Sequence, residues 1–245
     1  MKSTETTDEW TAKIEPFDSF WEGPEDVEKG YAKFYQFYKH NYLRHMPADK
    51  SARILVISCG PGYFVNLLKD QGYTDVLGID SDLEKVKHAR AKGLDCRVER
   101  ALPFVRDHPD EFDSIFCEQE INHLTKQEML DFFRLCHRSL KSGGTLIIHS
   151  LNGANPITGS ESLAQNFDHY NTCTEYTLLQ VLKYTGFSKV NVAPLKLYVF
   201  YRNPLNYVLI AADALLTLTF RLAFVMYGKS NKIFTKKIFA TGVKP

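Results

Sequence analysis

A glycine-rich turn and an aspartate eighteen residues beyond it are the residues best placed for chemistry in this chain. Gly60 and Gly62 belong to the segment Ser58–Gly62, which directly follows the continuous apolar run Ile54–Ile57. Small residues at such a turn let backbone N–H groups approach a ligand closely, and a helix that starts there attracts negative charge. Asp80 ends a second apolar run, where its carboxylate can accept hydrogen bonds from ribose hydroxyls. This pattern predicts a nucleotide-type cofactor site.

Two common nucleotide-binding patterns are excluded by the residues around this turn. The dinucleotide fingerprint requires a small residue three positions after Gly62, and Val65 stands there. The sequence also contains no Gly-Lys-Ser/Thr segment of the P-loop type. We therefore expect an adenosyl cofactor rather than a nicotinamide dinucleotide or ATP.

Alternating strands and helices must position these residues. Short apolar runs predict strands at 54–57, 75–79, 96–98, 112–117, 145–149, 190–192 (continuing toward 198) and 237–243. Helical spacing predicts helices at 64–69, 81–92, 126–140 and 175–183, the second opened by a capping-box spacing at Ser81–Glu84. Strands that alternate with helices form a parallel, doubly wound α/β sheet.

Residues 28–45 predict an additional helix at the N-terminal side of this core. Five aromatic residues lie three or four positions apart and therefore share one face: Tyr31, Phe34, Tyr35, Tyr38 and Tyr42. We expect this face to pack on the sheet. The alternative is that one tyrosine, Tyr35, reaches over the cofactor or the acceptor.

Composition limits the classes of partner and the compartment. The chain has 245 residues with a net charge of +1, so its bulk charge does not favour nucleic acid. Its five cysteines are scattered singly without a C-x-x-C pair, which argues against a zinc site, another metal cluster of that type or a disulfide framework. The acidic, polar segment 1–10 does not have the pattern of a signal peptide. We expect a reducing, cytoplasmic setting.

Four segments together resemble the class I S-adenosylmethionine-dependent methyltransferases: Ile54–Phe64, Val76–Asp80, Phe112–Leu124 and Leu140–Ile148. They occur in the family's order and near its spacing, and the resemblance covers about residues 30–200. It implies a Rossmann-like, mostly parallel seven-stranded sheet with an antiparallel last strand. It also implies S-adenosyl-L-methionine as the cofactor.

The resemblance implies roles for residues at matched positions. Ser58, Gly60 and Gly62 would lie along the methionine and ribose portions of the cofactor, and Asp80 would hold the ribose hydroxyls with Ser81 beside the adenine. The remaining matched residues would contact the adenine edge (Arg100, Ala101, Leu102), the methionine side (Cys117, Glu118) or the acceptor (His123).

Two positions depart from the family pattern. Val56 stands where the family usually has an acidic residue, and Ser58 stands where it usually has a glycine. The first change removes a carboxylate that organises the turn and the amino group of the cofactor. The second is a small change in side-chain size.

The implied reaction is an in-line methyl transfer, in which an oxygen acceptor benefits from a general base. Three histidines lie near the ends of predicted strands or in the following loops: His123, His149 and His169. The segment Asn166–Glu175 resembles the Thr-His-Glu segment of methyltransferases found in surface-polysaccharide gene sets, although Asp168 and Tyr170 replace the Thr and Glu. We expect His169 to be the base, with His149 second, and Asn152, which also matches that subgroup, to contact the acceptor.

The apolar segment Leu205–Tyr227 has the length of a membrane span, but Asp213 and Arg221 within it make spanning costly. One interpretation is a helix buried in the domain or against a second subunit of a homodimer. The other is a helix lying on a membrane through residues 204–228, with several lysines nearby. Because it precedes an antiparallel last strand, we expect it to be an insertion over the active-site face.

Four segments follow from these expectations. Residues 1–45 form an extension with the aromatic helix, 46–200 the cofactor-binding core, 201–230 the helical insertion and 231–245 the last strand. The function expected is O-methylation of a sugar or sugar-linked precursor of a surface glycan, in the cytoplasm or at the inner face of its membrane. Two alternatives are a methyltransferase for a small phosphorylated or carboxylated metabolite, and a non-catalytic cofactor-binding or membrane-associated subunit.

Overall fold

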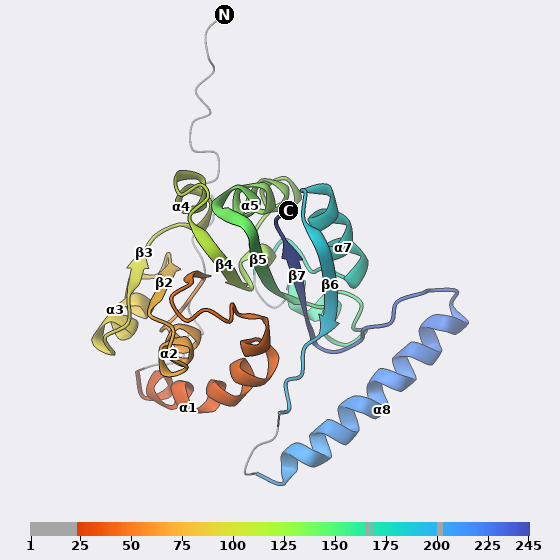
Figure 1. The fold of residues 1–245 in the computed structure, drawn as a ribbon. Helices are drawn as coiled ribbons and strands as arrows, with labels where there is room; N and C mark the ends of the chain where they lie inside the picture. The colour runs from red at the N-terminus through yellow and green to blue at the C-terminus, as the bar shows by residue number, and fades with distance from the viewer. Residues whose placement is uncertain (1–23, 165–166, 168, 200–202) are drawn as a thin grey trace, which may run out of the picture.

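The computed structural model describes residues 24–164, 167, 169–199 and 203–245 (Figure 1). The extension expected at 1–23, and the site positions Asn166 and Asp168, lie outside these residues. The strands are β1 (Arg53–Ile57), β2 (Asp75–Asp80), β3 (Cys96–Val98), β4 (Phe112–Glu118), β5 (Leu140–Leu151), β6 (Ser188–Pro194) and β7 (Lys237–Val243). The helices are α1 (Pro24–Asn41), α2 (Tyr63–Asp70), α3 (Leu83–Ala91), α4 (Ala101–Asp107), α5 (Lys126–Ser139), α6 (Thr158–Ala164), α7 (Glu175–Tyr184) and α8 (Leu205–Met226), with short 3-10 turns at η2 (Leu43–His45) and η3 (Glu120–Asn122).

The seven strands form one sheet in the order β3-β2-β1-β4-β5-β7-β6. β7 pairs antiparallel with both β5 and β6, whereas all pairs among β1 to β5 are parallel. The predicted α/β fold with an antiparallel last strand is therefore confirmed. The expected extension of the sixth strand to Tyr198 is wrong, because pairing with β7 stops at Pro194, opposite Ile238.

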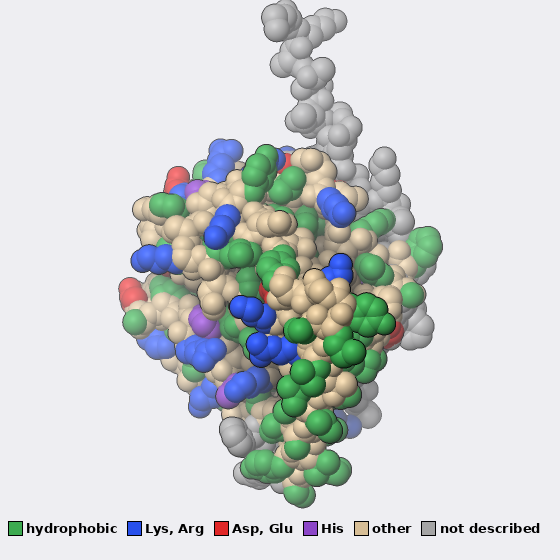
Figure 2. Space-filling view, turned by 90° about the vertical axis from the view of Figure 1, so that its right-hand side faces the viewer, with side chains coloured by type: hydrophobic (Ala, Val, Ile, Leu, Met, Phe, Trp, Pro, Cys, Tyr) green, Lys and Arg blue, Asp and Glu red, His purple; other side chains and the backbone are tan. Residues whose placement is uncertain are grey.

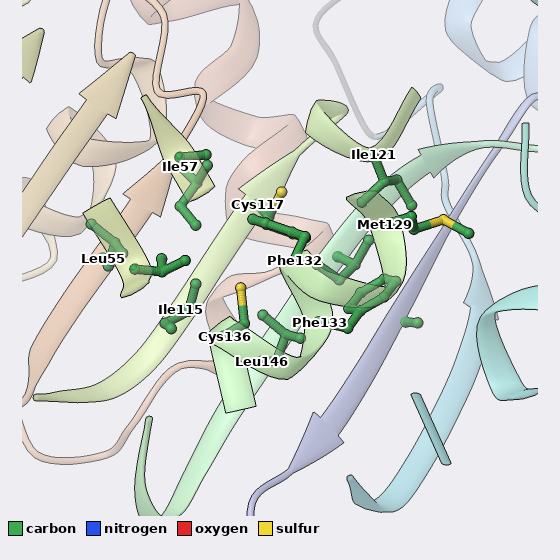
Figure 3. Packing of buried hydrophobic residues seen from close by; sticks show 14 of the residues in the cluster. Leu55, Ile57, Ile115, Cys117, Ile121, Met129, Phe132, Phe133, Cys136 and Leu146 are labelled. Atoms are coloured by element: carbon green, nitrogen blue, oxygen red, sulfur yellow. The ribbon is translucent and has the colours of Figure 1, made fainter. Parts of the chain in front are cut away.

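Two apolar layers cover the two faces of the sheet. Alternate strand residues point to opposite faces, so Leu55 and Ile115 pack with α4, α5 and α7, while Ile54 and Phe116 pack with α1, α2 and α3. Figure 3 shows the first layer, where Phe132 and Phe133 of α5 lie over β4 and β5, near Cys117 and Leu146. Both layers exclude water from the strands, as the predicted doubly wound sheet requires.

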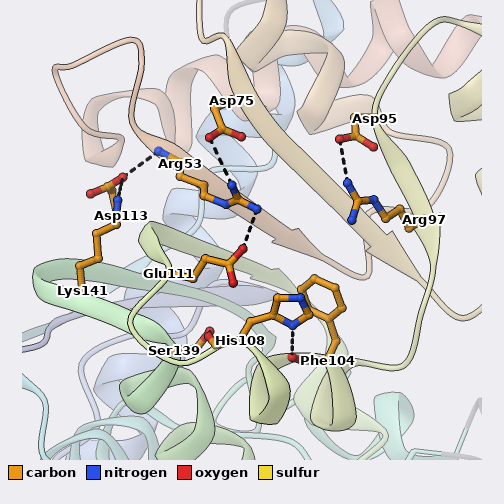
Figure 4. A network of polar contacts seen from close by, with 10 residues as sticks. All are labelled: Arg53, Asp75, Asp95, Arg97, Phe104, His108, Glu111, Asp113, Ser139 and Lys141. Carbon is orange, nitrogen blue, oxygen red and sulfur yellow. Dashed lines mark hydrogen bonds and ion pairs between the residues drawn. The ribbon is translucent and has the colours of Figure 1, made fainter.

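The amino ends of the central strands are joined by an ionic network (Figure 4). Arg53 at the start of β1 contacts Glu111 at 2.6 Å and Asp75 at 3.8 Å. Its backbone N–H donates to Asp113, which also receives Lys141 Nζ at 2.8 Å. This edge of the sheet is closed by polar contacts, and the glycine turn lies at the opposite, carboxyl edge.

Helix α8 projects from the domain on two long connections (Figure 1). None of its residues is fully buried. The expectation of a helix buried in the domain is therefore wrong. Within the described part of the chain, α8 is the one helix with the length and apolar composition to cross a membrane.

Candidate active site

The turn after β1 exposes backbone in a conformation that few side chains tolerate. Ser58, Gly60 and Gly62 have φ values of 54°, 54° and 83°. This left-handed conformation explains why a glycine is usual where Ser58 stands, because a side chain there is strained. An added Cβ at Gly60 would meet no atom within 4 Å, whereas at Gly62 it would lie 2.7 Å from Leu94. The turn thus packs on the protein at Gly62 and faces open space at Gly60.

Asp80 is fixed between the turn and the start of α3. One carboxylate oxygen accepts from the Gly60 N–H at 2.8 Å, and the other accepts from the Asp82 N–H at 2.9 Å. Burial raises the pKa of Asp80 despite these hydrogen bonds. The expected capping role at Ser81–Glu84 belongs to Asp82, whose side chain accepts from Glu84 N–H, and Ser81 is exposed. Asp80 is therefore held in place with acceptor capacity for ribose hydroxyls.

A second carboxylate lies against the other side of the turn. The Ser58 hydroxyl donates to Glu120 Oε2 at 2.5 Å. Burial raises the pKa of Glu120, and the nearby Asp80 carboxylate acts in the same direction. A positively charged group bound beside Glu120 would offset both the burial and the repulsion from Asp80, and would favour the ionised carboxylate.

A third carboxylate, Glu118, stands at the end of β4. The Tyr38 hydroxyl donates to its Oε2 at 2.5 Å, and His149 Nδ1 lies 3.3 Å from its Oε1. Burial opposes the charge, but contacts with His149 and Tyr38 outweigh it and lower the pKa of Glu118. The Glu118 side chain is 20% exposed, so this carboxylate stays ionised at a partly open position.

The strand register relates Glu118 to the missing carboxylate of the family pattern. Val56 on β1 is opposite Phe116 on β4, and it is buried in the same apolar layer as Phe64. Glu118 is two residues beyond Phe116 and therefore points to the same face of the sheet. The neighbouring strand thus supplies an acidic group near the position where Val56 has none.

Helix α1 packs closely over the turn. Tyr31 donates its hydroxyl to the Pro61 carbonyl at 2.5 Å, and its ring meets Tyr63 at 4.9 Å. A Cβ at Gly30 would lie 2.3 Å from the Tyr63 ring, so the absence of a side chain permits this approach. Tyr35 does not join the site, because its hydroxyl accepts from Gln71 at the far end of α2. Tyr31 and Tyr38 are therefore the tyrosines of α1 that contact the turn or Glu118.

His169 and His123 are brought together by the structure. Their ring centroids are 4.8 Å apart, and His169 Nδ1 lies 2.6 Å from the Ser162 carbonyl. A carbonyl can only accept, so Nδ1 carries the proton and Nε2 is the basic nitrogen of the neutral ring. The backbone N–H of Tyr170 donates to the Asn122 carbonyl, which ties this loop to η3 beside Glu120.

Three other predicted residues are placed in structural positions. His149 is fully buried on β5 between aromatic rings, and burial together with the Lys237 charge lowers its pKa. Cys117 faces the apolar layer with Phe132 rather than the cofactor edge (Figure 3). The Asn152 amide donates to the carbonyls of Ile233 and Thr235, so it joins the end of β5 to the chain returning from α8. These side chains hold the site together and do not face it.

The segment Arg100–Leu102, for which the resemblance predicts contact with the adenine, also has both exposed and buried residues. Arg100 is exposed at the start of α4, whereas Ala101 and Leu102 are buried in the apolar layer. The Glu99 N–H donates to the Asp80 carbonyl, which brings this segment beside Asp80. Arg100 and Ser81 are both exposed near Asp80, on the side where the resemblance predicts the adenine.

Sequence reasoning missed Glu120 and Tyr38. Glu120 lies in the segment Phe112–Leu124 and Tyr38 on the aromatic face of residues 28–45, but neither was assigned a role at the site. The valine at position 56 was the available signal, because a site that lacks one carboxylate needs another within reach. Among the described residues, no group of three or more His, Cys, Asp or Glu side chains is arranged to hold a metal ion. The carboxylates and the open glycine backbone instead fit a cationic, nucleoside-containing cofactor.

Comparison with known proteins agrees with this geometry. Residues 54–144 match the family model described as a methyltransferase domain. A ubiquinone biosynthesis O-methyltransferase from Xanthomonas campestris pv. campestris is 30% identical over 136 residues, which are 51% of this chain and 56% of that protein. A mitochondrial ubiquinone biosynthesis O-methyltransferase from Mus musculus is 30% identical over 131 residues, covering 47% and 35%. The chain thus spans about half the length of the bacterial relative.

Solved structures share the fold at low identity. A SAM-dependent methyltransferase from Archaeoglobus fulgidus has a TM-score of 0.64 and 18% identity, covering 93% of this chain and 97% of that one. Phosphoethanolamine N-methyltransferase 2 from Haemonchus contortus, solved with S-adenosyl-L-methionine, has a TM-score of 0.61 and 17% identity, covering 95% and 61%. The match of residues 54–144 to a methyltransferase domain and the shared fold make this chain similar to S-adenosylmethionine-dependent methyltransferases. The expected polysaccharide subgroup finds no support among these relatives.

Proposed function

We propose that this protein transfers the methyl group of S-adenosyl-L-methionine to a hydroxyl oxygen of an apolar acceptor. The oxygen as acceptor atom is supported by the two relatives, both of which are named O-methyltransferases of ubiquinone biosynthesis. The structural observation that carries the proposal is the link between the His169 loop and the turn: Tyr170 N–H donates to the Asn122 carbonyl of η3, and Glu120 of η3 accepts from Ser58. The localisation that matches this proposal is the cytoplasm, with the enzyme meeting its acceptor at the inner face of the membrane.

The cofactor fits the residues at the carboxyl edge. When bound, S-adenosyl-L-methionine supplies a methyl group activated by a sulfonium sulfur. Asp80 would hold the ribose hydroxyls, while Glu118 and Glu120 would bind the positively charged methionine portion. Tyr38 keeps Glu118 oriented through a 2.5 Å hydrogen bond, and Ser58 does the same for Glu120. Positioning by these fixed groups is the main contribution that an in-line transfer needs.

His169 would take the proton from the acceptor hydroxyl at its Nε2 atom. The carbonyl of Ser162 holds the proton on Nδ1, so the basic nitrogen is fixed by a backbone group. His149 is a weaker candidate because it is fully buried. A general base of this kind contributes about 10²–10⁴-fold to the rate.

Cofactor binding is tested first, by calorimetry with S-adenosyl-L-homocysteine. We expect saturable binding, weakened at least about tenfold in Glu118→Gln because a charge-assisted contact is lost. Lys229→Gln, far from the turn, is the control and should bind as the wild type does. Absence of binding at millimolar ligand would overturn the methyltransferase proposal.

The base is tested with His169→Ala and His169→Gln. We expect kcat to fall by about 10²-fold or more while the dissociation constant of S-adenosyl-L-homocysteine stays within about twofold. Equal losses of turnover and cofactor affinity would assign His169 a structural role instead.

A sugar hydroxyl on a lipid-linked glycan precursor is the second candidate acceptor. It is favoured by the resemblance of the segment around His169 to polysaccharide-associated methyltransferases. Mass spectrometry of methyl transfer should compare prenylated ring hydroxyls with lipid-linked and nucleotide-linked sugars. Transfer to a water-soluble phosphorylated or carboxylated metabolite alone would exclude both candidates.

A further inference from the structure

Helix α8 has two chemically different sides. One half-buried stripe runs along it at spacings of three and four, which is the helical period: Asn206, Ile210, Asp213, Thr217, Phe220 and Phe224. The stripe faces the domain, where Phe220 and Phe224 contact the ring of Phe234. A cavity of about 450 Å³ separates Asp213 and Thr217 from Lys196 on the domain. The polar residue that argued most against a membrane, Asp213, is therefore on the inner side.

The opposite side of α8 is apolar and exposed. Val208, Leu215, Leu222 and Met226 lie on it, each with between 59% and 85% of its surface exposed. The Thr219 hydroxyl, which also lies on this side, donates to the Leu215 carbonyl at 3.0 Å. No polar group of these side chains would lose a partner if the side were covered by hydrocarbon.

The connections of α8 decide how it can meet a membrane. The helix is inserted between β6 and β7, which pair with each other at Pro194 and Ile238. The connections before and after α8 therefore start and end at the same edge of the sheet. If α8 crossed a bilayer once, one of its ends would lie on the side of the membrane opposite to the domain. Return would require the polar segment 228–236 to cross hydrocarbon as unpaired backbone, which bilayers exclude. That segment is instead fixed to α7, since Lys232 N–H donates to Glu175 at 2.6 Å.

The charge of the insertion identifies the surface it fits. Residues 195–236 contain six basic residues and one acidic residue, a net charge of +5 in a chain whose total is +1. Figure 2 shows the apolar side chains gathered over the projecting helix, with Lys and Arg side chains on the domain beside them. An apolar helix face flanked by lysines is the pattern of binding to anionic lipid surfaces.

We propose that α8 lies in the plane of an anionic phospholipid surface, with Val208, Leu215, Leu222 and Met226 in the hydrocarbon boundary. The helix docks the domain on the membrane and does not span it. The carboxyl edge, which carries the candidate active site, would then lie close to an acceptor dissolved in the same membrane. Docking itself does not rest on the methyl-transfer proposal.

Vesicle sedimentation of the full chain tests the docking. With vesicles of 70% phosphatidylcholine and 30% phosphatidylglycerol we expect binding that falls severalfold in 0.5 M salt and severalfold again without phosphatidylglycerol. Leu215→Asp and Leu222→Asp should weaken binding at least tenfold, whereas Thr217→Asp, on the inner stripe, should stay within about twofold. Equal losses in all three variants, or no binding by the wild type, would overturn the proposal. Unchanged S-adenosyl-L-homocysteine binding verifies that each variant is folded and keeps failure here distinct from failure of the cofactor site.

Depth measurements test the orientation. All five native cysteines are buried, so single cysteines at Val208, Leu215 and Met226 can carry an environment-sensitive dye. Quenching by lipids spin-labelled at two depths should place the three dyes at one shallow depth. A dye at Leu215 that is much deeper than the other two would mean a spanning helix and contradict the proposal. Light scattering tests the alternative that a second copy of the chain covers the apolar side. A dimer that becomes a monomer in Leu215→Asp, together with no vesicle binding by the wild type, would assign this side to a dimer interface and contradict the proposal.

Discussion

The centre of the sheet and helix α8 are both rich in large apolar residues, but they use them in opposite ways. At the centre, Phe64, Phe116 and Tyr42 are almost completely buried and contact one another at ring distances of 4.3 to 6.0 Å. In α8 no residue is fully buried, and Leu215 is 65% exposed. Apolar composition alone therefore does not fix burial. The strands bury their residues because helices cover both faces, whereas α8 leaves one side for an external partner.

The two regions also differ in charge. The carboxyl edge of the sheet carries Asp80 and Glu120, which accept hydrogen bonds from the glycine turn, and Glu118 at the end of β4. The insertion that contains α8 carries a net charge of +5. The acidic groups thus lie at the strand ends, whereas the basic groups lie on the insertion that contains α8. This separation leaves the carboxylates able to bind a cation and the lysines able to bind anionic lipid.

Truncation of a central ring should have the largest effect. Phe116→Ala removes a fully buried side chain between Phe64 and Tyr42, where the surrounding rings cannot collapse without losing their own contacts. We expect the free energy of unfolding to fall by about 3–5 kcal/mol, measured by urea denaturation. A loss below about 1 kcal/mol would mean that this region is as loosely packed as α8.

The fold could be predicted from the sequence because an apolar run or a glycine determines a strand or a turn together with its immediate neighbours in the chain. The Ser58–Gly62 turn and Asp80 were found in the same way, since a tight turn and a strand end are readable from neighbouring residues. Glu120 and Tyr38 were not found, because their contacts depend on the register between β1 and β4 and on how α1 docks. Cys117 was misplaced for a related reason: successive strand residues face opposite sides, so Glu118 points to the site and Cys117 into the core.

The sequence predicted helix α8 itself, but it did not decide what surrounds the helix. Its length and composition allowed several partners, and Asp213 argued against a membrane. The side on which Asp213 lies depends on how the helix sits against the domain, through Phe220, Phe224 and Phe234. This packing is a tertiary property, which the helical period alone does not reveal.

Acidification should have an intermediate effect, and it acts on the buried centre. Burial and the Lys237 charge lower the pKa of His149 below its ordinary value of 6.5. The unfolded chain therefore takes up this proton first as pH falls, so the stability that neutral His149 provides is complete above pH 6.5 and declines below it. Between pH 7.5 and 5.5 we expect this residue to account for a loss of about 1 kcal/mol.

The measurement is urea denaturation of the wild type and His149→Phe at a series of pH values. His40, His45 and His137, whose pKa values burial also lowers, are present in both proteins and cancel in the difference. The variant should lose less stability than the wild type on acidification. Parallel curves for the two proteins would show that His149 titrates in the folded state as it does in the unfolded chain.

The smallest effect is expected on the outer side of α8. Leu215→Ala removes about as many apolar atoms as a core truncation would, but from a side chain that is 65% exposed. Alanine also favours the helix at least as well as leucine, so the free energy of unfolding in solution should change by less than about 0.5 kcal/mol. Urea denaturation without lipid measures this directly, with Phe116→Ala as the buried counterpart. A loss above about 2 kcal/mol in dilute solution would show that the outer side is already covered, by the domain or by a second copy, and the contrast between the two regions would disappear.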